Sequence, residues 1–278
     1  MLTPNVIGFL MFMLVPMAAT FGLSFTKYDM LSTPKFIGLQ NYADMLHDKI
    51  VWKVTWNTIV YTVLTVPVGM CISLFLAVVL DGPIRAKRFF RGAFFLPSIV
   101  SMVVVSIVWQ WIYNPEYGIL NFLLGLFGAS PRNWLGNSST VLVSLAAVGI
   151  WKRSGYDMML FLSGLQGISD TYYEAAMLDG ATKWQQFCYI TFPLLKPTTF
   201  FVFIMAIISS FQVFDQVNLM TEGGPGRSSS VLVHYLYQNA FQYFKLGYAC
   251  AIAYLLFAIV LVITVLNTRM EKRMRDIY

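Results

Sequence analysis

Six stretches of about 20 mostly apolar residues constrain the fold of this chain more than any other feature. An α-helix of roughly 20 residues is long enough to cross the ~30 Å hydrocarbon core of a bilayer. The sequence therefore predicts an all-α integral membrane protein, one domain over residues 1–278 with six transmembrane helices. We place the spans at approximately 5–25, 57–80, 93–113, 139–163, 198–220 and 247–267.

The low charge of the chain agrees with lipid as its solvent. Only 12% of the residues are charged, whereas soluble domains have about 25%. Four of the six spans contain no Asp, Glu, Lys or Arg. The fourth span contains Lys152, Arg153 and Asp157, and the fifth contains Asp215. These charged residues inside apolar runs need a separate explanation.

The basic residues favour one orientation of the helices. They concentrate between the second and third spans and after the sixth, at Arg85, Lys87, Arg88, Arg91, Arg269, Lys272, Arg273 and Arg275. Loops rich in Lys and Arg usually lie on the cytoplasmic side of a membrane. Both termini are therefore expected in the cytoplasm together with two connections, 81–92 and 164–197. Anchoring to anionic lipid would explain the same clusters and gives the same orientation.

The residue pattern of the connection 164–197 predicts a helix, a turn and a second helix. Residues 171–178 form a helix-compatible run whose start Asp170 could cap. Gly180 supplies the break, because glycine tolerates backbone conformations that other residues avoid. A second helical stretch over 182–190 is expected to end at the prolines that follow it, Pro193 and Pro197.

The first of these helices carries a compact surface at Glu174, Ala175 and Ala176. Small side chains let a helix sit closely in a groove of another protein, and a single carboxylate can determine its register. The alternative is an ordinary amphipathic loop that lies on the membrane surface. Periodicity does not separate these two interpretations, but the residue identities do.

The residues of this loop resemble the EAA motif of ABC importer permeases in its sugar-permease version. The match consists of Glu174-Ala175-Ala176, Asp179-Gly180-Ala181, Ile190 and Pro193. In that family the motif lies on a coupling helix that docks in a cleft of a cytoplasmic ATPase. The resemblance implies that the ATPase-coupling residues here are Glu174, Ala175, Ala176, Asp179, Gly180 and Ala181. Ser169 departs from the family, which usually has proline there.

The resemblance extends from about residue 36 to the C-terminus, through stretches that look like signatures of MalF-like sugar permeases. These are Phe36–Tyr42, Phe94–Pro97, Tyr117–Asn121 and Thr221–Pro225. It implies the type I importer fold and a location in the cell inner membrane. The implied partners are a second homologous permease, a cytoplasmic ABC ATPase dimer and an extracytoplasmic solute-binding protein. The implied cargo is a sugar or related polyol.

Other function classes find less support in the sequence. It contains no metal-ligand cluster, Gly-x-Ser-x-Gly elbow or Walker-type phosphate loop. We therefore expect no enzyme activity, catalytic residue, metal site or cofactor in this chain, with ATP and Mg bound by the partner ATPase. The alternative is an ion-coupled secondary transporter or channel. Such proteins often have internal repeats and ion-coupling carboxylates, for which Asp157 and Asp215 are the candidates.

Two helical faces mark a candidate substrate path. A charge inside a span costs about 2.5 kcal/mol or more and usually faces a cavity or a partner helix. Positions spaced i, i+3, i+4 and i+7 share one helix face, and the fourth and fifth spans each have such a set. In the resembling maltose-type permease the corresponding helices contact substrate. The candidates are Gly149, Lys152, Arg153, Tyr156, Ser209, Ser210 and Val213.

The chemistry of these side chains leaves alternatives open. Tyr156 offers a ring face and a hydroxyl, the two serines offer hydroxyls, and Arg153 could bind a carboxylate, a phosphate or a sugar hydroxyl. Alternatively, Lys152 and Arg153 neutralise Asp157 and Asp215. Ser209 and Ser210 would then serve close contact between helices.

Overall fold

The computed structural model describes residues 3–83 and 85–275, and the side chains up to Arg269. Lys272, Arg273 and Arg275 of the C-terminal basic cluster thus lie outside the described side chains. Nearly all regular structure is helical, in agreement with the predicted fold class. One small antiparallel hairpin joins β1 (Thr26–Lys27) to β2 (Lys35–Phe36).

Three of the described helical runs are long and apolar enough to cross a membrane. The first is Thr3–Ser24, which consists of α1 (Thr3–Phe9), the π-helical segment η1 (Leu10–Leu14) and α2 (Val15–Ser24). The second is α4 (Lys49–Asp81). The third is the apolar part of α15 (Leu246–Arg275).

Two further runs are helix pairs with a sharp bend. α5 (Lys87–Ile99) meets α6 (Met102–Ile112) at 99°, and the run Lys183–Leu194 meets α12 (Lys196–Phe211) at 64°. The described helices therefore provide three spans, or up to five if each bent pair counts as one. α8 (Val141–Gln166) is 26 residues long but carries three charged residues near its middle, and it is not among these five. The count of six stays a prediction.

The structure corrects two of the predicted spans. The span 93–113 is not one helix, because the chain is extended at Val100 and Ser101. The span 198–220 is also interrupted, because α12 ends at Phe211 and a short helix, α13 (Asp215–Met220), begins after the break. In both cases hydropathy detects the apolar run. It does not detect the break in the helix, because tertiary contacts determine where the break lies.

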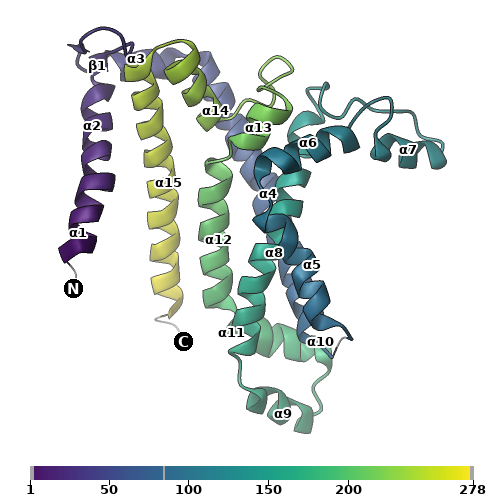
Figure 1. Cartoon of the computed structure of the whole chain (residues 1–278). Coiled ribbons are helices and arrows are strands. Elements are labelled where there is room, and N and C mark those ends of the chain that lie inside the picture. The colour runs from purple at the N-terminus through teal and green to yellow at the C-terminus, as the bar shows by residue number, and fades with distance from the viewer. Residues whose placement is uncertain (1–2, 84, 276–278) are drawn as a thin grey trace.

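α8 lies at the centre of the bundle (Figure 1). It packs most extensively on α4 and also contacts α5 and α12, while α15 packs on α2 and α12. One end of the bundle carries the hairpin and three short helices, α3 (Gln40–His47), α13 and α14 (Leu232–Tyr237). We call it the α3 end. The opposite end carries α9 (Asp170–Leu178), the beginning of α1 and the end of α15 (Figure 1), and we call it the α9 end.

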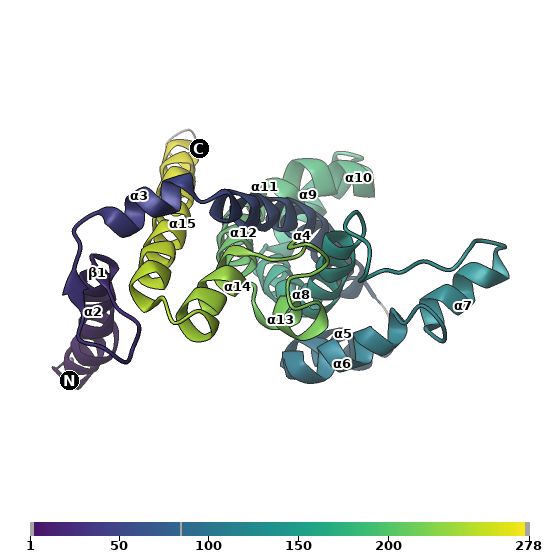
Figure 2. The same cartoon turned by 90° about the horizontal axis from the view of Figure 1, so that it is seen from above.

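α7 (Ile119–Leu126) projects sideways from the bundle near the α3 end (Figure 2). The π-helical segment η3 (Gln238–Gln242) joins α14 to the loop before α15. In this arrangement the connections 26–56, 114–138 and 221–246 share the α3 end, and 81–92 and 164–197 share the α9 end (Figure 1). The predicted grouping of the connections is therefore what the fold shows.

Asp48 holds the α3 end together. Its carboxylate caps α4 by accepting the Ile50 N–H at 2.8 Å, and it accepts the hydroxyls of Tyr235 on α14 at 2.7 Å and Tyr248 on α15 at 2.9 Å. Burial disfavours its charged form, but these hydrogen bonds outweigh burial and hold the pKa of Asp48 below its usual value. One carboxylate thus ties three helices.

Glycines allow helices to approach closely. A Cβ on Gly155 of α8 would collide with the carbonyl of Phe94 on α5, and one on Gly247 of α15 would collide with the carbonyl of Thr26. Interfaces of membrane helices are enriched in small residues for this reason. Gly155 therefore determines how closely α5 lies on α8.

Two of the four described apolar clusters lie along α4 and α8, with a polar band between them. The cluster nearer the α3 end includes Tyr61, Leu145, Val148 and Val217. The cluster nearer the α9 end includes Ala77, Met158, Phe161, Leu195 and Val202. Along α4 and α8 the residues between the clusters include polar ones, which are Thr65, Lys152, Arg153 and Asp157.

Candidate functional site

A cavity of about 560 Å³ occupies this polar band, lined by residues of α4, α5, α6, α8, α12 and α13. All seven residues predicted for the substrate path line it. Sequence analysis did not single out several other lining residues, chief among them Tyr61, Thr65, Ser98, Gln212 and Gln216. They come from α4 and from the two helix breaks, where no periodic pattern marks them.

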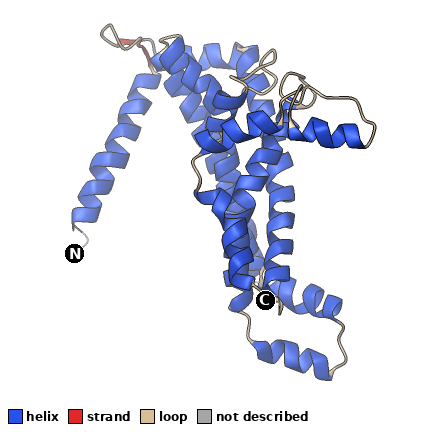
Figure 3. Ribbon diagram, turned by 45° about the vertical axis from the view of Figure 1, so that its right-hand side comes forward, coloured by secondary structure: helices blue, strands red, loops and turns tan. Residues whose placement is uncertain are grey.

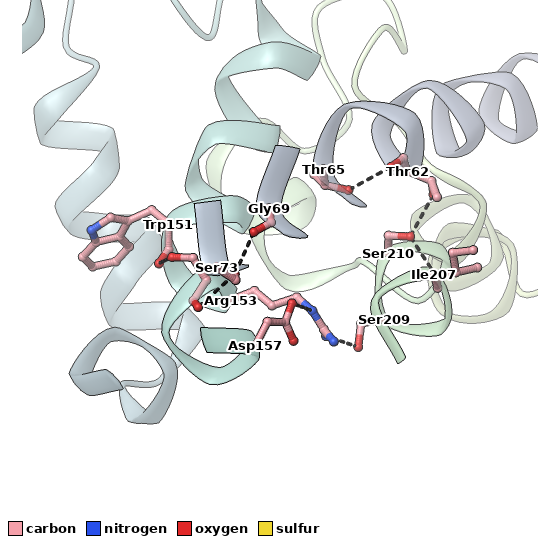
Figure 4. A network of polar contacts seen from close by, with 11 residues as sticks. Thr62, Thr65, Gly69, Ser73, Trp151, Arg153, Asp157, Ile207, Ser209 and Ser210 are labelled. Atoms are coloured by element: carbon pink, nitrogen blue, oxygen red, sulfur yellow. Dashed lines mark hydrogen bonds and ion pairs between the residues drawn. The ribbon is translucent and has the colours of Figure 1, made fainter. Parts of the chain in front are cut away.

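Arg153 forms an ion pair with Asp157 (Figure 4). Its Nε donates to Asp157 Oδ2 at 2.9 Å, and its Nη1 donates to Ser209 Oγ on α12 at 2.7 Å. Asp157 is 2% exposed and Arg153 is 27% exposed. A buried carboxylate needs a counter-charge, so Arg153 neutralises Asp157 and at the same time links α8 to α12.

Lys152 has a different role, because its ammonium binds the end of a helix. Its Nζ donates to the carbonyl oxygens of Val100 at 2.6 Å, Pro97 at 3.3 Å and Ser98 at 3.4 Å. The last carbonyls of a helix lack intrahelical partners and carry partial negative charge. Within the described part of the chain Lys152 forms no ion pair with Asp215. We therefore assign Lys152 to the break between α5 and α6.

Lys152→Met is expected to destabilise the protein by about 1.5–3 kcal/mol, the range for hydrogen bonds to a charged group. The carbonyls at the α5–α6 break would lose their donor. Thermal unfolding of the purified transporter complex would measure the effect. The control is Lys245→Met, which removes an exposed ammonium at the α3 end. Equal melting temperatures for the two variants would contradict the assignment.

Three of the predicted path residues serve packing. Ser210 donates to Ile207 O at 2.8 Å and to Thr62 Oγ1 of α4 at 2.9 Å (Figure 4), so its hydroxyl joins two helices. Gly149 makes room for the hydroxyl of Tyr61, with which a Cβ would collide. Val213 packs against the apolar cluster near the α3 end. Tyr156, which is 40% exposed, and Ser209 remain accessible.

α13 contributes Asp215 and Gln216 to the lining of the cavity. Gln216 is buried and donates to the hydroxyl of Tyr61 and to the carbonyl of Leu145. On the other side of α13, Gln110 of α6 donates to the carbonyl of Leu219 at 2.9 Å. The helix fragments that follow the two breaks therefore bind each other over the cavity.

The connection 164–197 projects beyond the α9 end of the bundle (Figure 3). It contains α9, α10 (Lys183–Gln186), the π-helical segment η2 (Phe187–Thr191) and α11 (Phe192–Leu194). The predicted order of helix, turn and helix is present. Gly180 has φ +77°, a conformation that favours glycine.

Two details of this connection differ from the prediction. Ser169 caps α9 by accepting the Thr171 N–H, whereas Asp170 is the first helical residue. Pro193 and Pro197 do not end helices, because each lies in the first turn of the next segment, where a missing N–H is tolerated. The actual interruption is at Leu195, between α11 and α12.

The predicted coupling residues lie on or beside the surface of this projection. Glu174, Ala175, Asp179 and Gly180 are exposed, and Ala176 and Ala181 are half-buried. Behind them, the Tyr173 hydroxyl lies 3.0 Å from Thr191 Oγ1 and joins α9 to η2. Leu178 is 90% exposed. The geometry is that of a braced helix with an uncovered outer face.

Comparison with known proteins identifies the family. Residues 56–276 match the family described as "Binding-protein-dependent transport system inner membrane component". The chain belongs to this family. It is thus a permease component of an ABC transporter and a multi-pass membrane protein.

Relatives of this permease cover nearly its whole length. It is 39% identical over 270 residues to the probable ABC transporter permease protein YurN of Bacillus subtilis, covering 95% of this chain and 91% of YurN. It is 31% identical over 280 residues to the trehalose/maltose transport system permease protein MalF of Thermococcus litoralis, covering 99% and 94%. The permease is therefore similar over nearly its whole length to a permease of a trehalose/maltose transport system.

The fold is also that of a solved transporter. The permease superposes with a TM-score of 0.86 on a chain of the bacterial alginate ABC transporter in complex with alginate pentasaccharide-bound periplasmic protein. The two chains are 23% identical, and the match covers 99% of this chain and 93% of that one. This likeness establishes the type I ABC permease fold.

Proposed function

We propose that this permease forms, with a second homologous permease, the translocation path of an ATP-driven importer for a sugar or related polyol. An extracytoplasmic binding protein delivers the solute, and a separate ATPase binds ATP and Mg and supplies the energy. The observation that carries the proposal is the exposed, braced α9 with Glu174 to Gly180 on its surface. The cavity and the sugar-transporting relatives support it.

The proposed mechanism couples α9 to the cavity through two helices. α8 runs from the cavity to the start of α9, and α12 returns from the end of the connection to the cavity. Arg153 and Ser209 link these helices at the cavity. Closure of the ATPase around ATP moves α9, and the cavity then opens to the other side of the membrane. A ligand shifts such a two-state equilibrium only by its differential affinity for the two states.

Gly180→Pro and Glu174→Ala are each expected to reduce solute transport at least tenfold while ATP hydrolysis continues. Proline requires a φ near −65° and is incompatible with the φ of +77° at Gly180. The measurement is ATP-dependent uptake and ATPase activity of the complete transporter in proteoliposomes. Gly180→Asn is the matched control, because asparagine tolerates the left-handed region. Wild-type transport by Gly180→Pro would refute the coupling role.

The same preparation tests the orientation and the rival function. The proposal places the α9 end and both termini in the cytoplasm. We therefore expect the thiol of Leu178→Cys to be labelled by a reagent added on the cytoplasmic side. Labelling from outside would overturn the proposal. A secondary transporter would drive uptake with an ion gradient and no nucleotide, which the importer should not do.

A further inference from the structure

We propose that the cavity selects uncharged polyhydroxylated solutes, and that Asp215 is the residue that binds their hydroxyl groups and excludes anions. This inference rests on the proposed function, since it names the class of solute for the same path. It is carried by the charges of the lining, by the contacts of its two cations and by the exposed carboxylate of Asp215.

The formal charges of the lining cancel. The charged side chains that line the cavity are Lys152, Arg153, Asp157 and Asp215, two positive and two negative. A site that accepts a phosphate or carboxylate needs positive charge to replace the hydration of the anion. This permease, which forms one half of the proposed path, provides no excess positive charge in the described lining.

Both cations already bind acceptors of the protein. The ammonium of Lys152 is bound to three carbonyl oxygens at the α5–α6 break. The guanidinium of Arg153 uses Nε for Asp157 and Nη1 for Ser209, and its Nη2 is buried without a partner in the described structure. An anion would have to displace the contacts of Lys152 or reach the buried Nη2 of Arg153, which would expose the carboxylate of Asp157 to a like charge. Anion binding is therefore opposed by geometry as well as by charge balance.

Asp215 offers the cavity an exposed carboxylate. It lies directly after the break between α12 and α13, lines the cavity and is exposed. Among the described residues its carboxylate forms no ion pair within 4 Å, although it interacts electrostatically with the ammonium of Lys152. An ionised carboxylate has two acceptor oxygens and no donor, so it can receive two neighbouring hydroxyls of a polyol. The same charge repels a phosphate or carboxylate.

The neighbours of Asp215 complete a polyol site. Gln212, also exposed in the lining, offers an amide donor and acceptor. Tyr156 presents an accessible ring, and Ser209 keeps a hydroxyl beside Arg153. An apolar ring face next to a few convergent polar groups is the usual composition of a small-molecule site. Hydroxyl groups that both donate and accept match this set, whereas an anion does not.

Charge selectivity of the cavity can be measured with thiol reagents. Thr65→Cys places a thiol in the lining on α4, in a transporter complex whose native Cys71, Cys188 and Cys250 are replaced by Ser or Val. The probes are ethyltrimethylammonium and ethylsulfonate methanethiosulfonates, with rates normalised to a free thiol. In the parent the formal charges of the lining cancel, so the two normalised rates should be similar. Asp215→Asn leaves one net positive charge and should make the anionic reagent react about tenfold faster than the cationic one, the enhancement expected of a focused field, whereas Glu116→Gln, outside the cavity, should leave the ratio unchanged.

Solute protection of the same thiol tests the hydroxyl contact. Maltose, trehalose and raffinose form the uncharged panel, and glucose 6-phosphate and digalacturonate the anionic one. At least one uncharged solute should slow labelling, the anionic solutes should not, and Asp215→Asn should weaken the protection. An unchanged reagent ratio in Asp215→Asn, protection by an anionic solute, or no protection by any uncharged solute would each overturn the inference. ATP-dependent uptake, assayed separately, reports whether the proposed function itself holds.

Discussion

Gly155→Ala is expected to lower the yield of folded permease in the membrane at least tenfold. The added Cβ would collide with the carbonyl of Phe94, which belongs to the backbone of α5 and cannot rotate away. Overpacking typically costs about 1–3 kcal/mol and sometimes more, and here α5 and α8 would have to separate. The measurement is the fraction of permease that elutes as assembled complex after mild detergent extraction.

Gly92→Ala on α5 is the matched control. A methyl group added at this exposed position would meet no atom of a neighbouring helix within 4 Å. Alanine is the better helix former by about 0.5–1 kcal/mol, so the control should express at least as well as the parent. Equal yields for Gly155→Ala and Gly92→Ala would show that α5 does not pack on α8 as described.

Arg153→Met is expected to destabilise the permease strongly, and addition of Asp157→Leu is expected to restore most of the loss. Removal of one partner of a buried pair costs about 3–5 kcal/mol, because the other charge remains buried and uncompensated. Asp157 is 2% exposed and has no other described counter-charge. Replacement of both charges by apolar side chains removes that penalty. Melting of the purified complex for the two single variants and the double variant completes the cycle.

Asp157→Leu alone should cost less than Arg153→Met. The Arg153 side chain is 27% exposed and keeps its bond to Ser209, so it can turn toward the water of the cavity. Simple additivity of the two single effects would mean that the pair does not interact. Uptake by the double variant then separates charge neutralisation from solute binding as the role of Arg153. Retained transport would show that Arg153 neutralises a charge and is not required by the solute.

α8 and α12 connect the cavity to α9. α8 and α12 both end at the connection 164–197, and both contribute side chains to the cavity. The Arg153–Ser209 hydrogen bond links α8 to α12, and the close packing at Gly155 holds α8 against α5. If these contacts were loose, α9 could move without changing the positions of the cavity residues on α8 and α12.

The sequence alone predicted the features that depend on local pattern. Apolar runs predicted membrane helices, because a helix needs about 20 apolar residues to cross the bilayer, and three described helices, or up to five with the bent pairs, are long and apolar enough. Helical spacing placed Arg153, Tyr156 and Ser209 on shared faces, and the structure brings them to one cavity. The identities around Glu174 indicated the family, which the match over residues 56–276 establishes. Each of these signals is contained within a few turns of helix.

Only the tertiary structure decided what the charged groups do. Whether Lys152 binds a solute or a helix end depends on the break at Val100, and that break is stabilised by contacts between helices distant in sequence. Asp215 becomes available because α12 ends early and α13 turns across the cavity. A charged side chain in lipid must find a partner, but the chain must fold before the partner is present. Composition therefore shows that a partner is needed, and packing determines which one it is.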